Sequence, residues 1–125
     1  MTDRKLLALA RAAARRAYAP YSRFQVGAAL LCRDGTVVTG CNVENASYGL
    51  SICAERVAIA TAVSEGKRAF EAIAVVALGR RGRNVRPCGA CRQVMAEFGA
   101  KMRVVCEDLT TTVADLLPER FVFRR

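Results

Sequence analysis

Three cysteines at the start of two predicted helices constrain the fold of this chain more than any other feature. The segment "CAE" (53–55) opens a helical pattern that runs to Gly66, and "PCGAC" (87–91) opens another that runs to Gly99. At a helix N-terminus, the helix dipole and free backbone N–H groups favour the thiolate, which is the form of cysteine that binds metals. If the two helix starts converge, Cys53, Cys88 and Cys91 can present three sulfurs to one ion.

The remaining pattern predicts a mixed α/β fold. Asp34-Gly35 indicates a hairpin between two apolar strands, and the apolar run at 70–78 indicates a strand buried on both faces. The predicted elements are a helix at 3–18 capped by Thr2 or Asp3, strands at 24–32 and 36–43, a loop at 44–52, a helix at 53–66, a strand at 70–78, a loop at 79–87, a helix at 88–99, a strand at 102–108 and a short helix at 112–118. The β–helix–β order favours parallel pairing in the later part of the chain. We predict a three-layer mixed five-stranded sheet with helices on both faces, in a single domain over residues 1–125.

Length and composition exclude several classes of protein. Hydrophobic residues make up 53% of the 125 positions, which is enough for a packed core. No apolar run approaches the roughly 18–20 residues of a membrane span, and the N-terminal segment reads as an amphipathic helix with no signal-peptide cleavage site. We therefore expect a cytoplasmic protein with reduced thiols, in which paired cysteines bind metal or take part in catalysis.

The net charge of +9 raises the question of a nucleic-acid partner. The densest basic run, "GRRGRNVRP" (79–87), is a predicted loop that could draw anionic ligands. Because the chain lacks the mixed aromatic and basic platform typical of single-strand binding, we expect no nucleic acid as partner.

The pair Cys88-x-x-Cys91 is compatible with three kinds of site. It could be a redox dithiol, or half of a structural zinc site closed by a fourth ligand such as Cys106. It could also join Cys53 in a catalytic zinc site, where three protein ligands leave one position open for water. Because the chain contains no histidine, a carboxylate must serve as the general base, and Glu55 stands two positions after Cys53.

Segments along nearly the whole chain resemble the small zinc-dependent cytidine deaminases that act on free nucleosides. The "CAE…PCGAC" pattern is similar to the zinc signature of that superfamily in its three-cysteine form. The segments that carry the resemblance are "YAPYSRFQVGAALL" (18–31), "GCNVENASYGLSICAERVAI" (40–59), "PCGACRQVMAEF" (87–98) and "DLLPERF" (115–121).

The resemblance implies one Zn²⁺ per subunit and a role for each matching residue. The implied zinc ligands are Cys53, Cys88 and Cys91, and Glu55 would carry protons between a zinc-activated water, the pyrimidine N3 and the leaving amine. The implied substrate contacts are Phe24 on the base, Asn42 and Glu44 on the ribose, and the backbone around Ala54 and Pro87. Arg56 would withdraw charge from the three thiolates, which otherwise make the site too electron-rich. From the residues alone, core packing for Phe24, turn formation for Asn42 and Glu44, and a solvated Arg56 remain open.

The resemblance also implies cytidine and deoxycytidine as substrates in pyrimidine salvage, and a homotetramer in which Tyr48 reaches a neighbour's site. An aminonucleoside deaminase of the blasticidin type is the alternative, because this chain stops at "FVFRR" soon after the "LLP" segment. A less favoured alternative is a structural-zinc module that binds nucleic acid. We expect Cys32, Cys41 and Cys106 to be free thiols that pack as small hydrophobic residues.

Overall fold

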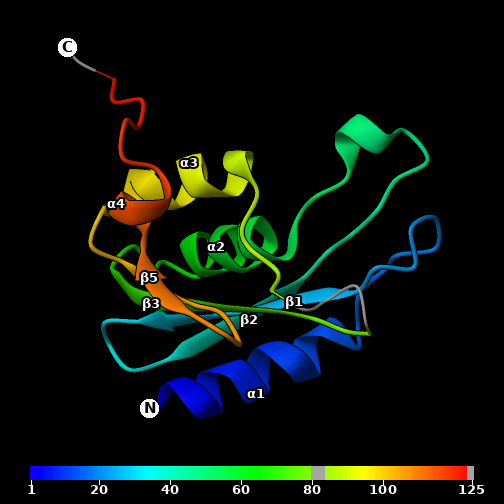
Figure 1. Cartoon of the computed structure of the whole chain (residues 1–125), viewed down its shortest axis with the longest axis horizontal. Helices are drawn as coiled ribbons and strands as arrows, with labels where there is room; N and C mark the ends of the chain where they lie inside the picture. The colour runs from blue at the N-terminus through cyan, green and yellow to red at the C-terminus, as the bar shows by residue number, and fades with distance from the viewer. Residues whose placement is uncertain (80–83, 124–125) are drawn as a thin grey trace.

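The computed structural model describes residues 1–79 and 84–123 and has three layers (Figure 1). Helix α1 covers one face of a sheet, and α2, α3 and α4 cover the other. Across the sheet the strands are β2 (Val37–Cys41), β1 (Val26–Cys32), β3 (Phe70–Ala77), β4 (Arg103–Val105) and β5 (Thr110–Thr112). The helices are α1 (Asp3–Ala14), the 3-10 turn η1 (Tyr48–Leu50), α2 (Ala54–Ser64), α3 (Gly89–Phe98) and α4 (Val113–Leu116). The three-layer, five-stranded fold expected from the sequence is confirmed.

The order of the strands could not be predicted from local pattern. β1 pairs antiparallel with both β2 and β3, β3 pairs parallel with β4, and β4 pairs antiparallel with β5. The parallel pairing expected for a β–helix–β unit is therefore correct for β3–α3–β4. In the earlier unit, β2–α2–β3, the two strands run in the same direction but β1 lies between them.

The ends of several elements differ from the sequence expectation. Helix α1 begins at the Thr2 cap, whose side chain accepts a hydrogen bond from Lys5 N at 3.2 Å, but it ends at Ala14 and not at residue 18. The chain leaves the helix there because Tyr18 N donates to the carbonyl of Asn42 at 3.0 Å. β4 has three residues, and the fifth strand, β5, covers 110–112, where the sequence pattern indicated a loop and the start of the last helix.

Apolar side chains pack on both faces of the sheet. Because successive strand residues point to opposite faces, β1 sends Leu30 toward α2 and α3 and sends Leu31 toward α1. Every β3 residue except Glu71 is buried, as the apolar run at 70–78 predicted. The helices α2 and α3 therefore pack on the same face of the sheet.

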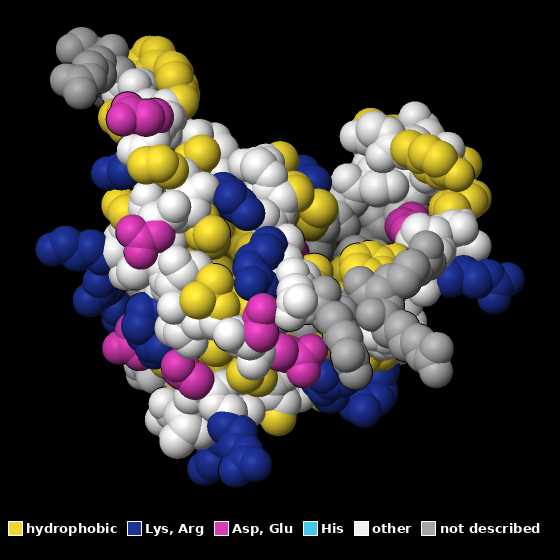
Figure 2. Space-filling view, in the orientation of Figure 1, with side chains coloured by type: hydrophobic (Ala, Val, Ile, Leu, Met, Phe, Trp, Pro, Cys, Tyr) yellow, Lys and Arg dark blue, Asp and Glu magenta, His cyan; other side chains and the backbone are white. Residues whose placement is uncertain are grey.

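Residues 43–52 project from the body of the protein and are called the arm below (Figure 1). The arm exposes large apolar side chains, with Tyr48 73% and Leu50 67% accessible. Figure 2 shows the Lys and Arg side chains of the described residues dispersed among acidic ones over the visible face. The central part of the basic run, residues 80–83, lies outside the described residues. No helix of the described chain has the length and hydropathy needed to cross a membrane.

Candidate metal centre and substrate pocket

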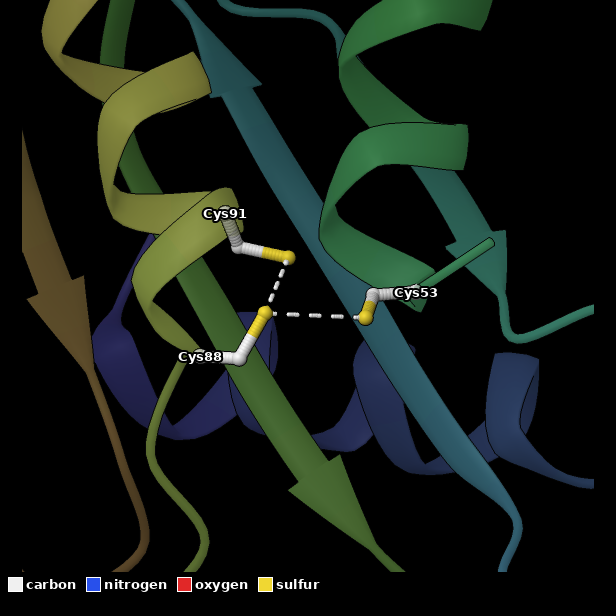
Figure 3. A group of neighbouring side chains, drawn as sticks. All are labelled: Cys53, Cys88 and Cys91. Atoms are coloured by element: carbon white, nitrogen blue, oxygen red, sulfur yellow. Dashed lines mark hydrogen bonds between the residues drawn. The ribbon is translucent and has the colours of Figure 1, made fainter. Parts of the chain in front are cut away.

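The N-termini of α2 and α3 converge above the sheet, as the cysteine pattern predicted. Cys53 is the N-cap of α2, Cys88 is the N-cap of α3, and Cys91 lies in the first turn of α3. The three sulfurs point toward one another (Figure 3), with 3.8 Å between those of Cys53 and Cys88 and 3.4 Å between those of Cys88 and Cys91. All three lie within 4.8 Å of one another.

These distances fit a tetrahedral zinc ion. A Zn–S bond of about 2.3 Å in tetrahedral geometry places two sulfurs roughly 3.8 Å apart. All six cysteines of the chain are free, so none of the three cluster sulfurs is taken up in a disulfide. Cys106 is a free thiol buried in the apolar core and is not part of the three-sulfur group, as expected for a small hydrophobic residue. The alternative in which Cys106 closes a structural zinc site is therefore not supported, and one coordination position stays open.

The sulfurs differ in their ease of ionisation. A hydrogen bond with Cys91, and then one with Arg56, lowers the pKa of Cys53 to about 5, although partial burial opposes the change. The same contact with Cys53, together with burial, raises the pKa of the Cys91 thiol. One thiolate is thus stabilised at neutral pH, and ionisation of a second thiol beside it is unfavourable. A bound divalent cation would offset this repulsion between thiolates, and its binding would release the thiol protons.

Arg56 lies against the cluster, in the first turn of α2. Its Nη2 is 3.6 Å from the Cys53 sulfur, and this contact raises the pKa of the guanidinium. Its Nε is buried and has no hydrogen-bond partner among the described residues. The guanidinium therefore contacts the Cys53 sulfur while the side chain is only partly buried, so it is not the fully solvated arginine that remained open from sequence alone.

Glu55 is the buried carboxyl group of the site. It is the second residue of α2, it is 3% exposed, and it lines the same cavity as Cys53 and Cys88. Burial raises the pKa of Glu55 to about 7, the range in which a carboxyl can both accept and donate a proton near neutrality. Because the neighbouring sulfurs leave a metal position open, Glu55 can act on a water bound there.

A cavity of about 280 Å³ opens beside the sulfurs, a size that suits a small ligand. The structure brings most of the predicted substrate residues to its wall, namely Phe24, Asn42, Glu44 and Ala54. It adds others that the sequence analysis did not name, which are Val26, Ser51, Ile52, Val75, Val85 and Arg86. Arg86 could have been noticed as the basic residue directly before "PCGAC". The others are apolar or small residues with no distinguishing sequence signal.

Asn42 and Glu44 are engaged by the backbone of the segment that carries Phe24. The amide of Asn42 accepts from Val26 N and donates to the carbonyl of Phe24, both at 2.8 Å. Glu44 accepts from the backbone N–H groups of Tyr21 and Ser22 at 3.0 and 3.1 Å and from the Ser22 hydroxyl. These contacts lower the pKa of Glu44. Asn42 and Glu44 therefore do hold the local backbone conformation, which was the alternative left open for them by the sequence, and both also line the cavity.

Two of the predicted substrate residues do not line this cavity. Tyr48 lies on the exposed arm, where its ring makes an edge contact with Tyr21 at 6.0 Å between centroids. Pro87 is buried, and its carbonyl accepts a hydrogen bond from Arg92 Nε at 2.8 Å. Within a single chain, therefore, neither side chain completes the pocket wall.

Three sulfur ligands and an open position are characteristic of catalytic zinc sites, whereas structural sites use four protein ligands. The protein therefore falls in the class of zinc-binding enzymes. Residues 1–107 match the family described as the cytidine and deoxycytidylate deaminase zinc-binding region, and the chain belongs to this family.

Relatives that match most of the chain support the assignment. A cytidine deaminase of Sporosarcina psychrophila is 52% identical, covering 97% of this chain and 92% of the relative. One of Halalkalibacterium halodurans is 58% identical, covering 84% and 83%. The crystal structure of cytidine deaminase from Burkholderia pseudomallei superposes with a TM-score of 0.90 at 50% identity, covering 97% of this chain and 100% of that one. A blasticidin-S deaminase of Bacillus cereus is 29% identical over 80% of this chain, so the blasticidin alternative is not favoured.

Proposed function

We propose that this protein hydrolyses free cytidine and deoxycytidine to uridine and deoxyuridine, releasing ammonia. The observation that carries the proposal is the three-sulfur cluster beside buried Glu55 at the wall of a small cavity. Relatives at 52 and 58% identity bear the name cytidine deaminase and support the same substrate class. The small volume of the cavity also argues against an extended polynucleotide as substrate.

The thiolates of Cys53, Cys88 and Cys91 would hold the zinc ion, which would supply Lewis-acid activation of a water molecule at neutral pH. Glu55 would accept the proton that this water loses, and it would deliver protons first to N3 of the pyrimidine and then to the leaving amine. Its burial in the cavity wall beside Cys53 and Cys88 supports this role. The balance is one water consumed and one ammonia released for each nucleoside.

The remaining residues orient the nucleoside and moderate the charge of the site. Phe24 packs on the base, and the backbone around Ala54 and Pro87 orients it. The side chains of Asn42 and Glu44 hold the ribose with the hydrogen-bonding capacity that their backbone contacts leave free. Separately, Arg56 draws negative charge from the sulfur of Cys53, which keeps the zinc ion an effective Lewis acid.

The test compares wild type with Glu55→Gln, following the loss of cytidine ultraviolet absorbance and measuring zinc content in both proteins. Removing a general acid–base group typically lowers the rate about 10²- to 10⁴-fold, while zinc content should stay at one per chain. Glu65→Gln is the matched control, because Glu65 is exposed at the far end of the same helix. If Glu55→Gln keeps both zinc and activity, the proton-transfer role is wrong. If zinc-loaded wild type leaves cytidine and deoxycytidine unchanged, the substrate assignment is wrong.

The protein is proposed to act as a homotetramer in the cytoplasm, in pyrimidine salvage, with Tyr48 completing the site of a neighbouring subunit. The exposed aromatic and aliphatic side chains of the arm support an interface there. Sedimentation should give the mass of four chains, and Tyr48→Ala should raise KM although Tyr48 lies outside the pocket of its own chain. A monomer that is fully active, with unchanged KM in Tyr48→Ala, would contradict this arrangement.

A further inference from the structure

Gly40 in β2 lies directly against the first turns of α2, the helix that carries Cys53 and Glu55. A Cβ atom at this position would be 2.5 Å from the backbone N of Ala58 and 2.7 Å from the carbonyl O of Ala54. Both partners are backbone atoms of the helix, so neither can move aside by rotating a side chain. The close approach of strand and helix is therefore possible only with glycine at position 40.

We propose that Gly40 is a positioning residue of the metal centre. By allowing α2 to lie close to β2, it sets the height of Cys53 and Glu55 above the sheet relative to Cys88 and Cys91. This role goes beyond the ligand and catalytic assignments above, and its link to activity rests on the proposed deaminase function. The two helices that supply the sulfurs are supported differently: α2 packs on β1 and β2, whereas α3 contacts α4 and α2.

The size of the displacement follows from the contact distances. To bring the 2.5 Å approach to the ordinary contact distance of 3.4 Å, α2 would have to retreat from β2 by about 0.9 Å. Because α3 is held by α4 as well as by α2, we expect this movement to displace Cys53 further than Cys88 and Cys91. A site of this kind tolerates roughly 0.5 Å of misplacement. The Cys53 sulfur would then no longer sit at bonding distance from an ion held by the other two.

The chain contains a matched control on the opposite face of the sheet. A Cβ atom at Gly27 in β1 would lie 2.0 Å from the carbonyl O of Ala10 and 2.4 Å from Ala14 N, both in α1. The steric conflict is at least as severe as at Gly40. However, α1 supplies no metal ligand and no residue of the pocket wall. Gly27→Ala therefore reports the cost of separating a helix from the sheet without displacing a ligand.

The experiment compares Gly40→Ala, Gly27→Ala and wild type, each loaded with Co²⁺ or Zn²⁺. We expect Gly40→Ala to bind Zn²⁺ about 10- to 100-fold more weakly in chelator competition, and its Co²⁺ protein to lose intensity in the thiolate-to-cobalt charge-transfer band. Gly27→Ala should lose thermal stability but keep the wild-type affinity and spectrum. The proposal is overturned if Gly40→Ala keeps the wild-type Zn²⁺ affinity and Co²⁺ spectrum, or if Gly27→Ala loses metal affinity to the same extent as Gly40→Ala.

If Gly40→Ala does not fold, Ala58→Val adds bulk from the helix side to the interface between α2 and the sheet, because Ala58 is fully buried and its backbone lies against Gly40. The same loss of Zn²⁺ affinity is expected, and unchanged affinity in folded Ala58→Val would overturn the proposal. Since both readouts follow the metal, they are independent of cytidine turnover. A wild type that binds Co²⁺ normally but leaves cytidine unchanged would refute the proposed function and leave the role of Gly40 standing.

Discussion

Replacing Asn42 by alanine tests whether this residue holds the pocket wall as well as the ligand. The side-chain amide extends the β1–β2 ladder, because it joins Val26 N and the carbonyl of Phe24 at 2.8 Å each, beyond the last paired residues Gly27 and Cys41. Alanine leaves both backbone groups without these partners. We therefore expect the folded protein to lose stability even in the absence of substrate.

The magnitude follows from the two lost hydrogen bonds. An unsatisfied buried group costs about 1–3 kcal/mol, and since both groups are only partly buried beside an open cavity, we take about 1 kcal/mol for each. A total of about 2 kcal/mol corresponds to a Tm lower by roughly 6–10 °C for a domain of this size. KM should rise as well, because the freed segment carries Phe24.

The assay is thermal unfolding of the metal-loaded protein, with KM for cytidine measured on the same samples. Asn45→Ala is the control: Asn45 is exposed on the arm, and its carboxamide accepts one hydrogen bond from Ser47 N at 2.8 Å. We expect that change to alter stability by less than about 0.5 kcal/mol. If Asn42→Ala raises KM without lowering Tm, Asn42 acts only on the ligand and our reasoning about the segment is refuted.

Three further outcomes are expected. Chelation of zinc should lower the Tm of wild type, since an ion present at 100 times its Kd stabilises the folded state by about 2.7 kcal/mol. Cys88→Ser should show no such zinc-dependent shift in Tm. An equal shift in both proteins would refute the assignment of Cys88 as a zinc ligand. Ile73→Ala, at a fully buried position in the central strand β3, should destabilise the fold by about 2–5 kcal/mol in urea unfolding, and a loss under 1 kcal/mol would contradict the packing argument. Hydrogen bonds from Thr36 and the contact with Lys67 hold the pKa of Asp34 well below its usual range. The ionised carboxylate therefore stabilises the folded state above a pH of about 4, and this stabilisation is lost as the pH falls further. The acid unfolding curve of Asp34→Asn should accordingly be shallower below pH 4, and an identical curve would exclude this contribution.

The elements around the metal centre were predictable because their signals are local. Gly66 and Gly99, both with positive φ, end or follow the two central helices as expected, and Thr2 caps the first helix. The last helix and β4 were predicted less well. The segment at 110–112 becomes a strand because it pairs with β4, and no local pattern reports a partner at the edge of a sheet. The position of β1 between β2 and β3 was likewise not predictable, because it depends on pairing between strands that are far apart in the sequence.

The sequence by itself determined the chemistry available to this protein: three cysteines and a glutamate at two helix starts, no histidine to replace them, and enough apolar residues to bury a sheet on both faces. Only the tertiary structure decided which of those groups meet. It brought Cys53 to Cys88, separated Cys106 from them, engaged Asn42 with the strand before it, and placed Gly40 beneath α2. The physical reason is that helix starts, caps and turns depend on neighbouring residues, whereas strand order and the distance between a helix and a sheet depend on contacts between residues far apart in the chain.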